Sequence, residues 1–192
     1  MPQVLSAIMS EQKEAQIEAT RKIRILLSLQ NDPPFDLVIS SPGLITRIIS
    51  FLDAFDTPQL QLEAAWCVTN IASGTIQCTS LLVQEGTVPK LIQLLNTMYD
   101  DIKEQAIWGL GNIAGESIEF RNLVIDSGIL NPLVNLLQNS TKLTMVQNAS
   151  RTLSNLCRGT PLPSMDVVCF IILFYYSRII LVYLFLLLLY ID

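Results

Sequence analysis

The chain has 192 residues, a formal net charge of −5 and no histidine. This length suits one domain or a short array of small repeats. The absence of histidine excludes Ser/His/Asp and Cys/His nucleophilic pairs and the common zinc sites that need imidazole. No C-x-x-C pair or glycine-rich phosphate-binding motif is present, so we expect no catalytic residue, no metal, no cofactor and four reduced thiols. The acidic balance disfavours nucleic acid as a partner and favours a basic peptide or protein.

We expect residues 1–10 to form a flexible N-terminus. From residue 11 to residue 159 the chain repeats itself, in units at about 11–73, 74–116 and 117–159. Trp66 and Trp108 are 42 residues apart, and Asn112 and Asn155 are 43 apart. A period near 42 that carries only helical patterns indicates an armadillo or HEAT α-solenoid, in which each unit buries its apolar face against its neighbours.

Each unit has the pattern of a short first helix, a second helix that begins beside a glycine, and a longer third helix. The glycines are Gly43, Gly86 and Gly128, and they let the chain turn where a side chain would clash. Three short helices with tight turns favour the armadillo repeat over the two-helix HEAT unit. We therefore predict an all-α fold, an armadillo-repeat α-solenoid that forms a right-handed superhelix of about three three-helix repeats.

The third helices can be phased from their apolar residues. A 4, 4, 3 spacing recurs in three superimposable stripes: Leu60, Ala64, Val68 and Ile71; Ile102, Ala106, Leu110 and Ile113; Met145, Ala149, Leu153 and Leu156. At about 100° per residue, Trp66 and Asn70 lie opposite the stripe. Trp108 and Asn112 repeat this placement, and Glu63 and Gln105 fall on the same outer face. A lone tryptophan is usually a core residue, but this recurrence favours a binding surface.

The chemistry of such a surface predicts its ligand. Parallel indole rings form slots that suit long aliphatic stems and attract Lys or Arg through cation–π interactions. An asparagine amide matches the N–H and C=O groups of an extended peptide. Acids at the slot ends pair with ammonium groups. The predicted ligand is an extended, lysine-rich segment.

The stretches "LEAAWCVTNIASGT", "EQAIWGLGNIAGES" and "TLSNLCRG" resemble the importin-α (karyopherin-α) family of armadillo-repeat nuclear import adaptors, over residues 11–159. The resemblance implies a receptor for nuclear localisation signals, present in cytoplasm and nucleus, that is not an enzyme. It also implies that the Gly74 carbonyl, the Thr79 hydroxyl and Glu116 hold the most discriminating lysine, with glutamate where the family usually has aspartate. The predicted peptide-binding residues are Trp66, Asn70, Ser73, Gly74, Thr79, Gln105, Trp108, Asn112, Glu116 and Asn155.

Three departures from the family pattern modify these expectations. Arg151 stands where a third tryptophan is expected, so one slot wall is lost and a lysine ligand is repelled. The chain begins about where the family's repeats start, so the importin-β-binding segment is missing and we do not expect importin-β binding. The family's later repeats and C-terminal cap are also missing, which predicts marginal stability or association.

Residues 160–166 are predicted to be a linker and residues 167–191 an apolar tail. By its length the tail could be a C-terminal helix that spans a bilayer, although Arg178 near its middle is costly. Its Phe, Ile, Leu and Tyr bias and its abrupt start in mid-repeat favour translated noncoding sequence instead. Two rival functions stay open: another armadillo scaffold that binds acidic or mixed peptides, and an interaction protein anchored in a membrane through residues 167–191.

Overall fold

The computed structural model describes residues 2–169, which contain helices and no strand. The chain divides into two units, residues 1–156 and 157–192. The helices of the first unit are, in chain order, α1 (Pro2–Met9), α2 (Lys13–Leu27), α3 (Phe35–Ile39), α4 (Leu44–Ser50), the 3₁₀ helix η1 (Phe51–Asp53), α5 (Pro58–Ile71), α6 (Ile76–Gln84), α7 (Thr87–Leu94), α8 (Asp100–Glu116), α9 (Ile118–Asp126), α10 (Leu130–Asn139) and α11 (Leu143–Leu156).

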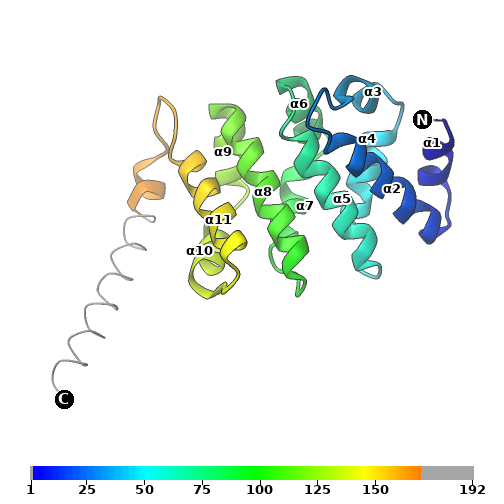
Figure 1. Ribbon diagram of the computed structural model, residues 1–192. Helices are drawn as coiled ribbons and strands as arrows, with labels where there is room; N and C mark the ends of the chain where they lie inside the picture. The colour runs from blue at the N-terminus through cyan, green and yellow to red at the C-terminus, as the bar shows by residue number, and fades with distance from the viewer. Residues whose placement is uncertain (1, 170–192) are drawn as a thin grey trace, which may run out of the picture. The chain divides into compact units, whose positions relative to one another are not determined.

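Four helices, α2, α5, α8 and α11, lie side by side in the first unit, each packed against the next (Figure 1). We call them the row helices. Helices α5, α8 and α11 are the third helices of the three predicted repeats, and the helix pairs α3/α4, α6/α7 and α9/α10 are the first and second helices. Helix α2 extends the row by one helix ahead of the first complete repeat. The repeat pattern includes α2 in the predicted unit 11–73 but does not predict that it is the first row helix.

The three predicted apolar stripes form the core between the repeats. Every stripe residue is buried, from Leu60 in α5 to Leu156 in α11, and most are fully inaccessible. The phasing of the third helices is therefore confirmed. Because the stripe faces inward, the opposite side of each row helix is left for contact with a ligand.

Glycines start the second helices as expected. Gly43, Gly86 and Gly128 have φ angles of 70°, 73° and 92°, in the left-handed region that residues with a Cβ rarely adopt. Each glycine lies in the turn between a short first helix and the second helix, where the chain reverses. The repeat boundaries therefore depend on backbone conformation as well as on the apolar pattern.

The first residues form a helix where the sequence analysis expected a flexible N-terminus. In α1, Ile8 is fully buried. This apolar contact was not predicted from the sequence. The Arg47 guanidinium donates hydrogen bonds to the backbone carbonyls of Ile8 (3.2 Å) and Ser10 (3.3 Å). These contacts fix the end of α1 against α4, and the two helices are in contact.

The glycines of α8 allow its neighbours to approach closely. A Cβ added at Gly109 would lie 3.1 Å from Thr69 Oγ1 of α5, and one added at Gly111 would lie 2.5 Å from Thr152 Oγ1 of α11. The two threonine hydroxyls use this proximity, since each donates to an α8 carbonyl: Thr69 Oγ1 to Gln105 O (2.8 Å) and Thr152 Oγ1 to Ile107 O (2.9 Å). The glycines in "WGLGNIAGES" thus serve packing between repeats.

Two cysteines lie inside this core. Cys67 and Cys78 are both buried and reduced, as the sequence predicted. Burial, together with the nearby Glu63 carboxylate, raises the pKa of the Cys67 thiol above its ordinary value. The thiol lies 3.4 Å from the Thr20 carbonyl, so Cys67 acts as a small packing residue between α2 and α5.

Within residues 2–169, no helix is long and apolar enough to cross a membrane. The predicted tail at 167–191, with its apolar helix and Arg178, falls almost entirely on residues 170–192, outside the described residues. Its two interpretations both remain predictions.

Candidate binding site

The asparagines of the row helices connect neighbouring repeats. Each donates a side-chain N–H to a backbone carbonyl of the preceding row helix: Asn70 Nδ2 to Arg24 O (3.3 Å), Asn112 Nδ2 to Thr69 O (3.1 Å) and Asn155 Nδ2 to Gly111 O (2.8 Å). Asn70 also donates to Ser28 Oγ at 2.9 Å. These bonds fix the orientation of each amide. Within residues 2–169, the three Oδ1 atoms accept no hydrogen bond from the protein, so they remain available to a ligand N–H.

The two tryptophans lie on the same side of the row helices as the asparagines. Trp108 is 41% exposed, an unusual value for a tryptophan in the middle of a helix. Trp66 is only half-buried. The prediction that both rings point away from the core is confirmed by this exposure. The first ring is partly covered, however, because the Arg24 guanidinium lies 4.3 Å from its centroid.

Gln105 lies one turn before Trp108 and carries an unsatisfied group. Its side chain is nine-tenths buried, and its Oε1 atom has no hydrogen-bond donor among the described residues. A buried polar atom without a partner costs about 1–3 kcal/mol. The atom is closed to solvent, so a ligand donor could reach it only after the side chain turned outward. The burial of Gln105 corrects its predicted place on the outer face.

The predicted lysine pocket is brought together only in part. Ser73 is exposed, and its hydroxyl donates to the Asn70 carbonyl at 2.7 Å. Gly74 is closely packed, because a Cβ there would lie 3.0 Å from the Phe35 ring and 3.1 Å from the Ile71 carbonyl oxygen. Thr79 is fully buried, and its hydroxyl lies 3.5 Å from the Thr75 carbonyl. The Thr79 hydroxyl is therefore not accessible at the surface for the predicted contact with a ligand.

Glu116 is the last residue of α8, is half-buried, and stands apart from the other acids of α5 and α8. Those others all have cationic partners: Glu63 pairs with Arg21 and Arg24, Asp100 with Lys103, and Asp101 and Glu104 with Lys142. Hydrogen bonds to Asp101 and Glu104 raise the pKa of Lys142. Within the described residues Glu116 has no such pair. It is the one acid on these two helices left to bind an external cation.

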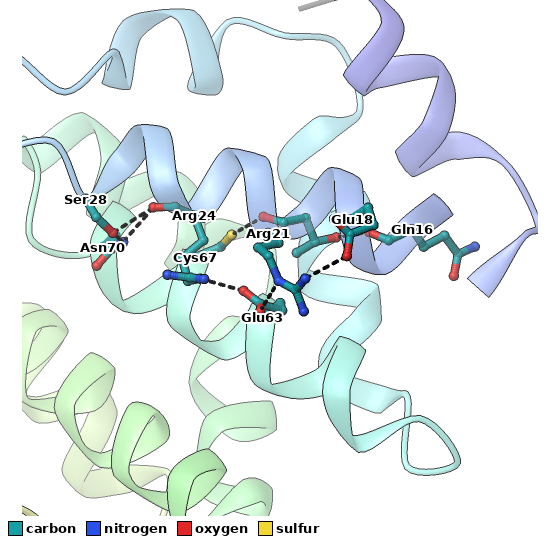
Figure 2. Close-up of polar contacts among 9 residues, drawn as sticks. Gln16, Glu18, Arg21, Arg24, Ser28, Glu63, Cys67 and Asn70 are labelled. Atoms are coloured by element: carbon teal, nitrogen blue, oxygen red, sulfur yellow. Dashed lines mark hydrogen bonds and ion pairs between the residues drawn. The ribbon is translucent and has the colours of Figure 1, made fainter. Parts of the chain in front are cut away.

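A cluster around Glu63 was missed by the sequence analysis (Figure 2). The Glu63 carboxylate is 7% exposed and accepts from Arg21 Nε at 3.0 Å and Arg24 Nε at 2.5 Å. Phasing had placed Glu63 on the outer face, but both arginines lie on α2, which was not phased. Arg21 and Glu63 are 42 residues apart, which equals the repeat period. This spacing could have predicted the ion pair from the sequence.

The third rung of the row lacks an aromatic ring. Asn155 keeps its bond to α8, so α11 is in register, and Arg151 takes the place that Trp108 has one repeat earlier. Arg151 is exposed. The face of α11 therefore presents a cation next to the asparagine, as the sequence indicated.

We call the set Trp66, Asn70, Gln105, Trp108, Asn112, Glu116 and Asn155 the Trp/Asn face. Its best-formed part is on α8, where Gln105, Trp108, Asn112 and Glu116 follow at intervals of three, four and four residues and so share one side of the helix. It offers an open indole ring, hydrogen-bonding amides and an unpaired carboxylate. Among residues 2–169, no three histidine, cysteine or acidic side chains gather as metal ligands.

Comparison with known proteins identifies the class. The Armadillo/beta-catenin-like repeat family matches residues 75–115 and 117–158. A designed armadillo repeat protein in complex with the peptide (KR)4 superposes with a TM-score of 0.77 at 25% identity, over 90% of this chain and 69% of that one. A second designed armadillo repeat protein, 23% identical over 90% of this chain and 69% of that one, gives 0.79. The chain is an armadillo-repeat protein with an α-solenoid fold.

Curated relatives narrow the class. Importin subunit alpha-3 of Arabidopsis thaliana is 45% identical over 166 residues, covering 86% of this chain and 31% of that protein. Importin subunit alpha-4 of the same plant is 52% identical, covering 84% and 30%. Importin subunit alpha-B of Dictyostelium discoideum is 50% identical, covering 88% and 33%. The chain is homologous to the importin α subunits over most of its length, and it spans about a third of theirs.

Proposed function

We propose that the chain binds extended, lysine-rich segments of the nuclear localisation type on its Trp/Asn face. The observation that carries this proposal is the arrangement on α8. The exposed Trp108 ring lies between Gln105, whose buried oxygen lacks a donor, and Asn112 and Glu116, whose acceptor oxygens are unpaired. The oxygens of Asn112 and Glu116 can be satisfied by a peptide that carries backbone N–H groups and an ammonium.

The chemistry selects a cationic and extended ligand. A lysine stem can lie along the Trp108 ring, with its ammonium attracted by the ring and by an acid. The asparagine Oδ1 atoms can accept from peptide N–H groups, which is possible for every second residue when the peptide is extended. An acidic peptide could still donate its N–H groups to the asparagines, but it would gain no attraction from the ring or the acid and would be repelled by Glu116.

The comparisons support the same ligand class. The curated relatives are named as importin α subunits, and one similar designed armadillo protein is in complex with the basic peptide (KR)4. On this basis we propose that the chain belongs to an adaptor for protein import, acting in the cytoplasm and nucleus by binding rather than by catalysis. Because the chain spans about a third of the relatives' length, the choice of cargo is part of this proposal, and the absence of importin-β binding stays a prediction.

The proposal is tested by titrating the protein with a labelled lysine-rich peptide and with versions in which each lysine in turn is alanine. One alanine version should bind about tenfold more weakly than the parent, because one lysine uses the Glu116 carboxylate. The Glu116→Gln variant should lose about the same affinity for the parent peptide and little for that alanine version. Fluorescence anisotropy gives both values.

Asp126→Asn is the matched control, since it removes one negative charge from an exposed residue of α9. It should change the dissociation constant less than twofold at about 0.15 M salt, where distant charges are screened. Equal losses in Glu116→Gln and Asp126→Asn would mean that only net charge matters. Stronger binding of an acidic peptide would support a different armadillo scaffold.

A further inference from the structure

The 42-residue period defines equivalent positions on successive row helices. Glu63 corresponds to Gln105, and by the same offset Arg24 corresponds to Trp66 and Trp66 to Trp108. The place one row helix ahead of each tryptophan is therefore filled by a long cation, Arg24, at Trp66 and by an indole ring, that of Trp66, at Trp108.

At the first of these places, the arginine covers the aromatic ring. The Arg24 guanidinium lies 4.3 Å from the Trp66 centroid, and its Nε donates to Glu63 Oε2 at 2.5 Å. The Arg24 side chain is only 17% exposed and that of Glu63 only 9%. Arg21 Nε holds the second carboxylate oxygen at 3.0 Å. An indole face, a carboxylate and a cation are thus already assembled within the protein, and Figure 2 shows the contacts of the carboxylate with the two arginines.

At the second place the same elements lack a cation. Thr69 turns its hydroxyl to the Gln105 carbonyl at 2.8 Å, and within residues 2–169 no cation lies over the Trp108 ring. Gln105 is 42 residues after Glu63, so it holds the equivalent position. Its Oε1 has no donor, whereas both Glu63 oxygens have one. The interval between Trp66 and Trp108 is therefore left for a ligand, and the α2 side of Trp66 is not.

We propose that Arg24 ends the row of cation subsites by permanently filling the subsite on the α2 side of Trp66, so that a bound basic segment places no cation beyond Trp66. Arg24 is then a specificity-determining residue that sets how long a basic segment can be recognised. This inference rests on the proposed function, because it assumes that the Trp/Asn face binds basic peptides.

A free ligand cannot readily displace this arginine. Arg24 is tethered to the same protein, so its effective concentration at Trp66 is far above that of any peptide lysine. Its planar guanidinium stacks on the ring while it donates to the carboxylate, a combination that a lysine ammonium does not reproduce. Displacement would also leave a nearly buried Glu63 with one partner fewer, which is costly.

The test compares one short basic peptide with two extended versions, each carrying one more lysine two to three residues beyond one end. This spacing follows from a helix separation of about 8–10 Å and a rise of about 3.3 Å per extended residue. Wild-type protein should bind all three within about twofold, because Arg24 closes one end of the row and Arg151 repels a cation at the other. In Arg24→Thr, which removes the guanidinium from Trp66, one extended peptide should bind about tenfold more tightly than the short one.

Arg151→Trp is the matched control, because it also removes a positive charge from this side of the row helices. Both variants should bind every basic peptide somewhat better. In Arg151→Trp, however, the peptide that gains affinity over the short one should be the one extended at the other end. Thermal unfolding confirms that each variant is folded, and Arg24→Gln replaces Arg24→Thr if the latter is not. No extension-specific gain in a folded Arg24 variant, or a tenfold gain for both extensions in wild type, would overturn the inference. Failure of the short peptide to bind wild type would reject the binding face itself, and the inference with it.

Discussion

Replacement of Trp108 by alanine is expected to weaken binding of a lysine-rich peptide by at least about 30-fold, which corresponds to about 2 kcal/mol. The reason is the position of the ring at the centre of the Trp/Asn face, where it is 41% exposed and no protein cation covers it. Alanine removes both the wall that packs against the lysine stem and the cation–π attraction. Anisotropy titration of wild type and variant measures the ratio of dissociation constants.

The fold should survive this substitution, since the apolar stripe of α8 does not include Trp108. Phe55→Ala is the matched control, because Phe55 is another exposed aromatic residue, 55% accessible, in the turn before α5. It should leave the dissociation constant unchanged within about twofold, as expected for a residue outside the contact. A Trp108→Ala protein that is folded and binds like wild type would remove the indole ring from the site.

Among the glycines of α8, replacement of Gly111 by alanine is expected to lower the stability of the protein most. The new Cβ would lie 2.5 Å from Thr152 Oγ1, and the Thr152 backbone is close as well, with its Cα at 3.4 Å. Overpacking of this kind costs about 1–3 kcal/mol, and the better helix propensity of alanine recovers about 1 kcal/mol. The net loss is then at most about 2 kcal/mol, so the melting temperature should fall by up to about 8 °C.

A double-mutant cycle with Thr152→Ala isolates the cause. The Thr152 hydroxyl lies 2.9 Å from both Ile107 O and Asn148 O and has one proton to donate between them, so it cannot rotate away without losing this hydrogen bond. Thr152→Ala removes the clashing oxygen, and in that background Gly111→Ala should cost almost nothing or stabilise the helix. Equal effects of Gly111→Ala in both backgrounds would show that the cost arises elsewhere.

The repeat architecture could be predicted from sequence because it depends on local patterns. The stripe through Ala64, Ala106 and Ala149 has a helical period that does not require knowledge of neighbours, and its burial is confirmed. The outward placement of Trp108 follows from the same period. The chemical character of the α8 face was therefore accessible before the structure was known.

What the sequence did not reveal depends on contacts between helices. The bond from Asn70 to the Arg24 carbonyl and the stacking of Arg24 on Trp66 both need the position of α2 relative to α5. Helix α2 has no tryptophan or asparagine to mark its register, so it was not recognised as the first row helix. For the same reason the burial of Thr79 could not be predicted from the motif that contains it.

The most direct test of the central claim uses the protein's own fluorescence. The chain contains two tryptophans, Trp66 and Trp108, and both belong to the Trp/Asn face. A lysine-rich peptide without tryptophan or tyrosine should change the tryptophan emission saturably, with the dissociation constant found by anisotropy. The change should be lost mainly in Trp108→Phe, because Arg24 already covers part of Trp66. Binding by anisotropy with unchanged tryptophan emission would contradict the account, since the peptide would then lie elsewhere on the protein.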